Sequence, residues 1–435
     1  PAINYKGYDA FRDGYITLEQ SGSNTLVKFD ADGLGGSDAA TTVAVLNNVV
    51  ASDLVTDNFT PGYFSEFSTA QLAAMSTAQI SALTTKQIQA LTSVHITVLS
   101  TAQIASLRTD QIVALTTDQA RSLTTQQLRS INSTQLLALE NQDLAALTTA
   151  QISSLNTAQI KTLTTSQISA LQTDQVSSLT TSQVVTLSSA QITALNTADI
   201  AALTTSQITS LTKGQMAVLS TAQIVALTTA QTSSLLTSQL AALSTNQLTA
   251  LETADLVSLK ATQIAALSTS QMSSLTTVQV TALTTGQLVS LSTAVVSSLT
   301  TAQVSALRTS QLRALTTAQI TALTTSDVLA LSNTQASSLT TAQVAALTTS
   351  QVSSLSTGQL NAMTTTQFAA FSLTQVGALR GQIAVTASNL PTKAWTQLLG
   401  SDSYVYDNSM TTGADGAIYV SGFTNGNLDG QTNNG

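Results

Sequence analysis

An eight-residue motif repeats without a gap from residue 68 to residue 379. Its first two copies read STAQLAAM (68–75) and STAQISAL (76–83), and the register is unbroken over 39 copies. We call each copy an octad and number its positions 1 to 8. A short fixed period is typical of a solenoid or fibre, whose length grows with copy number, and this outweighs the two or three globular domains that 435 residues otherwise suggest.

The eight positions differ in the residues that they accept. Position 8 is Leu in 35 of 39 octads, position 5 is nearly always a large apolar residue, and position 7 is always small or Val. Position 4 is Gln in 33 of 39, and position 2 is almost always Ser, Thr or Asn. Charged residues fall mainly at positions 1, 3 and 6. The octad therefore separates apolar positions from charge-tolerant ones.

This separation fits a helix and not a strand. At about 100° per residue, positions 4, 5, 7 and 8 form one contiguous arc, and positions 1, 3 and 6 form the opposite arc. A strand requires strict alternation, which the octad lacks. We therefore expect positions 4, 5, 7 and 8 to be buried.

One continuous helix is excluded, because its apolar stripe rotates by about 80° with every octad. Ser or Thr at position 1 with Gln at position 4 fits a capping box, although the stricter position 2 is an alternative cap. Helices this short are marginal alone, so stability must come from stacking. The sequence predicts an all-α solenoid of very short capped helices with small β-rich flanks; the alternative is a β-solenoid with Gln and Thr ladders.

The buried Gln of each octad needs hydrogen-bond partners, either in the backbone at the corners or in a side-chain ladder. The Leu at position 8 is expected to fill the core. Representative structural residues are Gln79, Leu83, Gln151, Leu155, Gln207, Leu211, Gln303 and Leu307.

The N-terminal flank, 1–57, alternates like short strands between turn signals, and 58–67 reads as a linker with Pro61 and Gly62. Asp30 and Asp32 stand two residues apart beside Gly33. This spacing offers oxygen ligands to calcium, and an Asp-Gly hairpin turn without metal explains it equally well.

The run YITLEQSGSNTLVKFDADG (15–33), with TVAVLNNV (42–49) and on to Asp57, resembles the target region of bacterial type I secreted, repeats-in-toxin proteins. The resemblance implies an extracellular setting and a giant adhesin or surface protein.

The C-terminal flank changes character after a linker at 380–394. The stretches WTQLLGSDSY (395–404), ADGAIYVSGFT (414–424) and GNLDG (426–430) are similar to the bacterial secreted β-propeller repeat. Residues 395–435 correspond to one blade. A single blade leaves its faces and edges open, so we expect either that the chain is part of a much larger protein or that the blade packs on the repeat.

Charge and composition exclude several classes of function. The octads hold equal numbers of acidic and basic residues, so nothing attracts nucleic acid. No apolar run approaches the ~18 residues of a membrane span, and no cleaved N-terminal signal is evident in this segment. Cysteine is absent, which excludes disulfides and thiol chemistry and suits a secreted protein.

No catalytic constellation is evident, so we do not expect an enzyme. His95, the only histidine, replaces a Gln, and we interpret it as a tolerated substitution. The abundant Ser and Thr therefore lack a His partner for nucleophilic activation. Asp also takes the Gln position, where a structural role in the first helical turn is favoured over cation binding; these residues are Asp143, Asp199, Asp255 and Asp327.

The sequence therefore predicts an extracellular structural repeat protein: a stalk, spacer or filament-forming module of a large bacterial adhesin or surface layer. We expect no cofactor in the repeat, with calcium confined to the flanks. Expected partners are other copies of the chain and other cell-surface or extracellular matrix components. The alternative is a module that binds a repetitive ligand, such as a polysaccharide or ice, through its Thr arrays.

Overall fold

Every octad contains one short helix, preceded and followed by extended residues. The computed structural model describes residues 16–30, 39–53, 68–379, 405–412 and 418–424. Each helix begins at position 2, so position 1 is the N-cap and the alternative cap at position 2 is wrong. At a typical corner, Leu155 has φ −58° and ψ 139°, and Asn156 has φ −78° and ψ 164°. Two consecutive extended residues thus break the helix once in every octad, and the predicted α-solenoid is confirmed over the β-solenoid.

The chain divides into two units, Pro1–Leu203 and Thr204–Gly435, which we describe separately. The helices of the first unit are α1 (Thr69–Ala74), α2 (Thr77–Ala82), α3 (Thr85–Ala90), α4 (Ser93–Val98), α5 (Thr101–Ala105), α6 (Thr109–Val113), α7 (Thr117–Ser122), α8 (Thr125–Ser130), α9 (Ser133–Ala138), α10 (Asn141–Ala146), α11 (Thr149–Ser154), α12 (Thr157–Thr162), α13 (Thr165–Ala170), α14 (Thr173–Ser177), α15 (Thr181–Thr186), α16 (Ser189–Ala194) and α17 (Thr197–Ala202).

The helices of the second unit continue the same series. They are α18 (Thr205–Ser210), α19 (Lys213–Ala217), α20 (Thr221–Val225), α21 (Thr229–Ser234), α22 (Thr237–Leu240), α23 (Thr245–Ala250), α24 (Thr253–Ser258), α25 (Ala261–Ile264), α26 (Thr269–Ser274), α27 (Thr277–Ala282), α28 (Thr285–Val289), α29 (Thr293–Ser297), α30 (Thr301–Ala306), α31 (Thr309–Ala314), α32 (Thr317–Ala322), α33 (Thr325–Ala330), α34 (Asn333–Ser338), α35 (Thr341–Ala346), α36 (Thr349–Ser353), α37 (Thr357–Ala362), α38 (Thr365–Phe368) and α39 (Leu373–Ala378).

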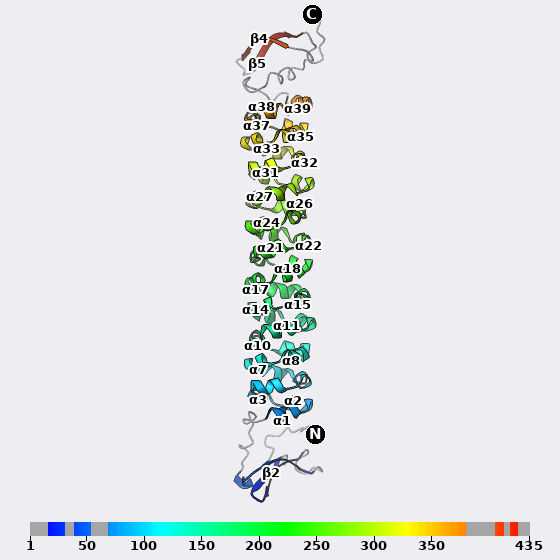
Figure 1. Cartoon of the computed structure of the whole chain (residues 1–435), viewed down its shortest axis with the longest axis vertical. Coiled ribbons are helices and arrows are strands. Elements are labelled where there is room, and N and C mark those ends of the chain that lie inside the picture. The colour runs from blue at the N-terminus through cyan, green and yellow to red at the C-terminus, as the bar shows by residue number, and fades with distance from the viewer. Residues whose placement is uncertain (1–15, 31–38, 54–67, 380–404, 413–417, 425–435) are drawn as a thin grey trace. The chain divides into compact units, whose positions relative to one another are not determined.

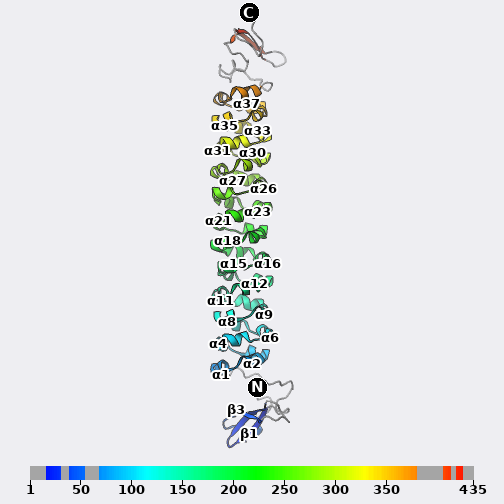
Figure 2. The same ribbon diagram turned by 90° about the vertical axis from the view of Figure 1, so that its right-hand side faces the viewer.

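Within each unit, every helix packs on the helix three octads later, so one coil of the solenoid contains three octads. In the first unit α4 packs on α7 and α7 on α10, and Figure 1 shows α10 directly above α7. Figure 2 shows α6, α9 and α12 stacked in the same way. In the second unit α29 packs on α32 and α32 on α35. Each coil therefore has three sides, and one helix of every coil lies on each side.

The core is built from positions 5 and 8, with the side chain of position 4 buried beside them. Ile152 is 0% exposed and Leu155 3%. Positions 1, 2, 3 and 6 face solvent in nearly all octads. The prediction that position 7 is buried was too strong, since most of these residues are only half-buried. Ser106 shows the reason: its hydroxyl lies at the rim of the helix, where it donates to the carbonyl of Gln103 (2.7 Å) and to that of Thr77 in the preceding coil (3.2 Å).

The N-terminal flank forms a small antiparallel sheet, as its alternating pattern predicts. Its strands, β1 (Ile16–Ser21), β2 (Asn24–Phe29) and β3 (Thr41–Leu46), lie in the order β1-β2-β3 and are followed by a 3-10 turn, η1 (Ala51–Asp53). Gly22 occupies the β1–β2 turn with φ +63°, a conformation that favours glycine. In the C-terminal flank, β4 (Val405–Thr412) pairs antiparallel with β5 (Ile418–Thr424). The predicted linkers, 58–67 and 380–394, lie outside the described residues.

Candidate functional site

The Gln at position 4 closes the N-terminus of its own helix. The backbone N–H of Ser100 donates to Oε1 of Gln103 (2.7 Å), while the Ser100 hydroxyl accepts from the backbone N–H of Gln103 (3.2 Å). This reciprocal pair is a capping box, and it satisfies two backbone donors that a helix start leaves free. The box recurs in nearly every octad of 68–379, as the pairing of positions 1 and 4 predicts.

The other end of the same amide crosses to the preceding coil. Nε2 of Gln103 donates to the carbonyls of Leu72 (2.9 Å) and Met75 (2.7 Å), which are positions 5 and 8 of the octad four places earlier. Both carbonyls lie at the C-terminal end of α1, where the Leu72 carbonyl also accepts from the N–H of Met75 (3.2 Å). We call this arrangement the glutamine bridge: Oε1 on the N-cap of its own octad, and Nε2 on the corner of the coil before.

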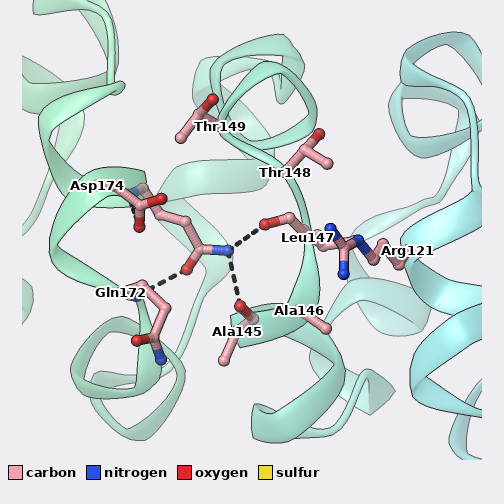
Figure 3. A pocket seen from close by; sticks show the side chains of 9 residues that line it. Arg121, Ala145, Ala146, Leu147, Thr148, Thr149, Gln172 and Asp174 are labelled. Carbon is pink, nitrogen blue, oxygen red and sulfur yellow. Dashed lines mark hydrogen bonds between the residues drawn. The ribbon is translucent and has the colours of Figure 1, made fainter.

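Gln175 makes its bridge at a surface pocket of the first unit, and Figure 3 labels its partners Gln172, Ala145 and Leu147. Dashed lines join its side chain to the backbone N–H of Gln172 (2.7 Å) and to the carbonyls of Ala145 (3.2 Å) and Leu147 (2.6 Å). Arg121 and Asp174 are the charged residues that line this pocket. The lining holds no His or Cys and a single carboxylate, so it contains no pair of groups that could activate a nucleophile.

The structure places the predicted structural residues as follows. Gln151 is buried and bridges to the carbonyls of Arg121 (2.9 Å) and Leu123 (2.5 Å). Gln303 is buried and bridges to Met272 (3.0 Å) and Leu275 (2.6 Å). Of the two partners proposed for the glutamines, the structure therefore has backbone at the corners and no side-chain ladder among these residues.

Gln207 is also buried, and its Oε1 accepts from the N–H of Thr204 (2.6 Å). Gln79 departs from the pattern: it is exposed, because α2 belongs to the first coil and the described residues form no coil before it. The Leu residues all lie in the core with little exposure, and these are Leu83, Leu155, Leu211 and Leu307.

In octads with Asp at position 4, a bond that the sequence did not suggest replaces the contact between coils, while Asp199 and Asp327 keep the bond to their own N-cap. The hydroxyl of Thr117, at position 2 three octads earlier, donates to Oδ1 of Asp143 (2.8 Å). Thr173 bonds Asp199 (3.0 Å) in the same way, and Thr301 bonds Asp327 (2.9 Å). Since nearly every octad has Thr at position 2, the sequence carries no signal for this pairing.

Asp143 is held in an unfavourable environment. It is fully buried, and its Oδ2 has no hydrogen-bond partner in the described part of the chain. Burial raises its pKa above the ordinary value, the bond from Thr117 opposes this, and the charge of Glu140 adds to it. Burial likewise raises the pKa of Asp199 and Asp255. A carboxylate at position 4 therefore destabilises the contact between coils that a Gln at this position stabilises.

Three further residues depart from the repeat. His95 copies half of the bridge, because its Nδ1 accepts from the N–H of Thr92 (3.2 Å). Val295 has no polar side chain, so its octad keeps only the bond from the Val295 N–H to the Ser292 hydroxyl (3.3 Å). The hydroxyl of Thr232, a position 5 residue, is buried without a partner among the described residues. A polar residue at an otherwise apolar position is the sequence signal for that defect.

The described residues include only one of the two predicted calcium ligands. Asp30 follows β2, while Asp32 lies outside the described residues, so calcium binding there stays a prediction. Over the described ranges, no three His, Asp or Glu side chains gather as metal ligands do. No helix in those ranges combines the length and hydrophobicity that crossing a bilayer demands.

Comparison with known proteins identifies the repeat. The model of the ALTTAQ repeat matches seven segments that together cover more than half of the chain: 64–93, 96–125, 136–173, 176–213, 248–285, 282–317 and 320–357. Neither the curated proteins nor the solved structures contain a match to this chain.

Proposed function

Because the chain belongs to the ALTTAQ repeat family, we propose that residues 68–379 are a structural spacer module of an extracellular bacterial surface protein. The module holds other domains of that protein apart and carries out no catalysis itself. One observation carries this proposal: the repeated polar groups of the octads are satisfied by the chain's own backbone. Gln303, for example, uses its Oε1 on Thr300 (2.8 Å) and its Nε2 on Met272 and Leu275.

The surface of the octads supports the same role. Positions 1, 2, 3 and 6 are mostly Ser, Thr and Ala, so the sides of each coil carry short side chains and few charges. Ligand sites in proteins are usually concave, with a few convergent polar groups in an apolar lining. The lining of the pocket in Figure 3 is mostly polar, and it includes Gln175, whose side-chain amide is already used in a bridge.

The extracellular setting rests on the flanks. Their resemblance to type I secreted proteins and to a secreted β-propeller repeat supports export, as does the absence of cysteine. We expect antibodies against the octads to label intact cells of the source bacterium or to detect the protein in the medium. Recovery from the cytosolic fraction alone overturns this part of the proposal.

The spacer role is tested by shortening the repeat in whole coils. Deleting residues 220–291 removes nine octads, which is three coils, and joins octads in register. We expect the helical circular dichroism per octad to be retained and the maximum dimension in small-angle X-ray scattering to fall with the length removed. Deleting residues 220–287 breaks the octad register and is the matched control, for which we expect lost helicity. An unchanged maximum dimension in the in-register deletion contradicts the spacer role.

A second function has its own supporting observation. Exposed Thr residues at position 2 are stacked along one side of the second unit: Thr293, Thr317 and Thr341 belong to α29, α32 and α35, which pack in succession. A regular hydroxyl array suits a repetitive ligand such as a polysaccharide or ice. Thermal hysteresis or glycan binding by the wild-type chain, lost when these three residues are changed to Lys, favours this alternative. A wild-type chain that shows neither activity supports the spacer role instead.

A further inference from the structure

The glutamines of the first coil make only half of the bridge. Oε1 of Gln71 accepts from Ser68 (2.9 Å), that of Gln79 from Ser76 (2.8 Å) and that of Gln87 from Thr84 (2.7 Å). Their Nε2 atoms have no partner among the described residues, because no coil precedes them. Gln71 and Gln79 are exposed and Gln87 is half-buried, whereas the glutamines from Gln103 onward are buried.

His95 extends this set by one octad. Its Nδ1 accepts from Thr92, so in the neutral ring the proton lies on Nε2. That Nε2–H takes the place of the glutamine amide as a donor. The side chain is 7% exposed, and its partner coil would be the one before the first. The start of the repeat therefore presents four donors, one for each of its first four octads.

The last coil shows the complementary deficiency. Gln375 bridges to Val344 (3.1 Å) and Leu347 (2.6 Å), and it is the last glutamine of the repeat. The carbonyls at positions 5 and 8 of the octads after Leu347 receive no glutamine within the described chain. In the next three octads these carbonyls belong to Val352, Leu355, Leu360, Met363, Phe368 and Phe371.

Apolar side chains at this end are also less covered than elsewhere. Position 5 is fully buried throughout the interior, yet Phe368 and Val376 are only half-buried. The rings of Phe368 and Phe371 lie edge to face, with centroids 5.9 Å apart. The end of the repeat thus offers carbonyl acceptors beside partly exposed apolar side chains.

We propose that the last coil of one molecule binds the first coil of a second copy, end to end. Glutamine bridges then form across the junction with the same geometry as inside the repeat, where Nε2 bonds the carbonyls at positions 5 and 8 of the octad four places earlier. The pairs are Gln71 with Val352 and Leu355, Gln79 with Leu360 and Met363, and Gln87 with Phe368 and Phe371. His95 bonds Val376 and Leu379. Because the two surfaces differ, the contact is heterologous and adds further copies without closing. This inference goes beyond the spacer role and does not depend on where the protein is located.

The test removes the donors and keeps the caps. In the full-length chain, Gln71→Glu, Gln79→Glu and Gln87→Glu together retain an oxygen for each capping box and remove the three glutamine Nε2 donors, so that His95 supplies the one donor left of the four. We expect sedimentation velocity of the wild type to show reversible association that grows with concentration. The association constant of the triple variant should be lower by a factor of about ten or more. The charge-matched control is Gln89→Glu with Gln126→Glu and Gln172→Glu, whose exposed side chains form no part of a bridge, and it should associate as the wild type does.

Disulfide trapping tests the direction of the contact, since the chain has no cysteine of its own. Position 2 of one octad lies close to position 3 three octads later: Asn141 Nδ2 donates to Ser166 Oγ at 2.7 Å. The equivalent pair across the junction is Thr365 of one copy and Ala78 of the next. We expect the single variants Thr365→Cys and Ala78→Cys to cross-link on oxidation when mixed and not when each is alone, with Asn141→Cys/Ser166→Cys in one chain as the positive control. A wild type that stays monomeric at all concentrations, or equal cross-linking by each variant alone, overturns the proposal.

Discussion

Nε2 of Gln175 lies 2.6 Å from the carbonyl oxygen of Leu147, 28 residues earlier in the chain. That separation joins position 4 of one octad to position 8 of the octad four places before, which is the corner directly beneath its own helix. The same amide closes its own helix start through Gln172 (2.7 Å). One side chain thus satisfies backbone groups in two successive coils, and the spacing of 28 residues is compatible with coils of three octads.

Removing one interior bridge should destabilise the solenoid. Gln303→Ala leaves the N–H of Thr300 and the carbonyls of Met272 and Leu275 without their side-chain partner. Buried groups left unsatisfied cost about 1–3 kcal/mol each, and part of this is recovered by relaxation, so we expect a loss of about 2–4 kcal/mol in the free energy of unfolding. Urea titration followed by circular dichroism measures it.

The matched control is Gln79→Ala, in the first coil. Gln79 makes the capping bond to Ser76 (2.8 Å) but donates to no carbonyl of the described chain, so its removal should cost only about 0.5–2 kcal/mol, as for a helix cap. Equal losses for the two variants would show that the contact between coils contributes nothing.

Completing a missing bridge should stabilise the chain. Val295 stands where other octads have Gln, and the pattern assigns it the N–H of Ser292 and the carbonyls of Ile264 and Leu267. Val295→Gln is expected to raise the free energy of unfolding by about 1–3 kcal/mol, because it gives a side-chain partner to each of these three backbone groups, of which the Ile264 carbonyl already accepts from the Leu267 N–H (3.1 Å). Val295→Glu is the comparison, since it supplies the acceptor without the donor and should fall below the Gln variant at neutral pH. Thermal unfolding of both variants that gives Glu the higher midpoint contradicts the bridge.

The sequence predicted the local structure well because each octad contains its own signals. The apolar arc, the Ser or Thr at position 1 and the Gln three residues later act within eight residues, so helix, break and capping box follow from them. The number of octads per coil could not be read in the same way. Since all octads are alike, stacking with any number per coil repeats the same pattern, and only the packing of each helix on the helix three octads later reveals three.

The buried carboxylates were predictable as substitutions and not as contacts. Asp143 and Asp199 were recognised as replacing Gln, with a structural role favoured. Their bonds to Thr117 and Thr173 join residues 26 apart, and this separation has meaning only once three octads form a coil. Position 7 was overestimated as buried because the helical angle alone places it on the apolar arc, whereas stacking puts Ser106 at the rim.

Replacing a buried hydroxyl that has no hydrogen-bond partner should raise the free energy of unfolding. Thr232 is fully buried at position 5, and its Oγ1 bonds nothing in the described chain. Thr232→Val keeps the shape of the side chain and removes the unsatisfied group, so we expect the free energy of unfolding to rise by about 1–2 kcal/mol. Thr245→Val, at an exposed position 2, serves as the control and should change it by less than about 0.5 kcal/mol. A destabilised Thr232→Val in the urea titration is the contrary outcome.

The buried carboxyl groups predict that acidification stabilises the repeat locally. Burial raises the folded-state pKa of Asp143, Asp199 and Asp255 above the ordinary value of 3.8, so the folded chain binds these protons more tightly than the unfolded chain does. Their stabilising contribution is complete below that ordinary value and is lost as the pH rises through the raised pKa. Asp110 contributes to the pH dependence of stability with the opposite sign, because its hydrogen bond with Arg108 lowers its pKa and supplies stability that acid removes.

We therefore compare the triple variant Asp143→Asn/Asp199→Asn/Asp255→Asn with the wild type by urea unfolding between about pH 4 and pH 7. The variant should be the more stable at pH 7, and its advantage should shrink as the pH falls, because Asn imitates the protonated form. Asp118→Asn, at an exposed position 3, controls for the loss of one negative charge. An advantage that is absent at pH 7, or that grows towards pH 4, is incompatible with carboxylates strained by burial.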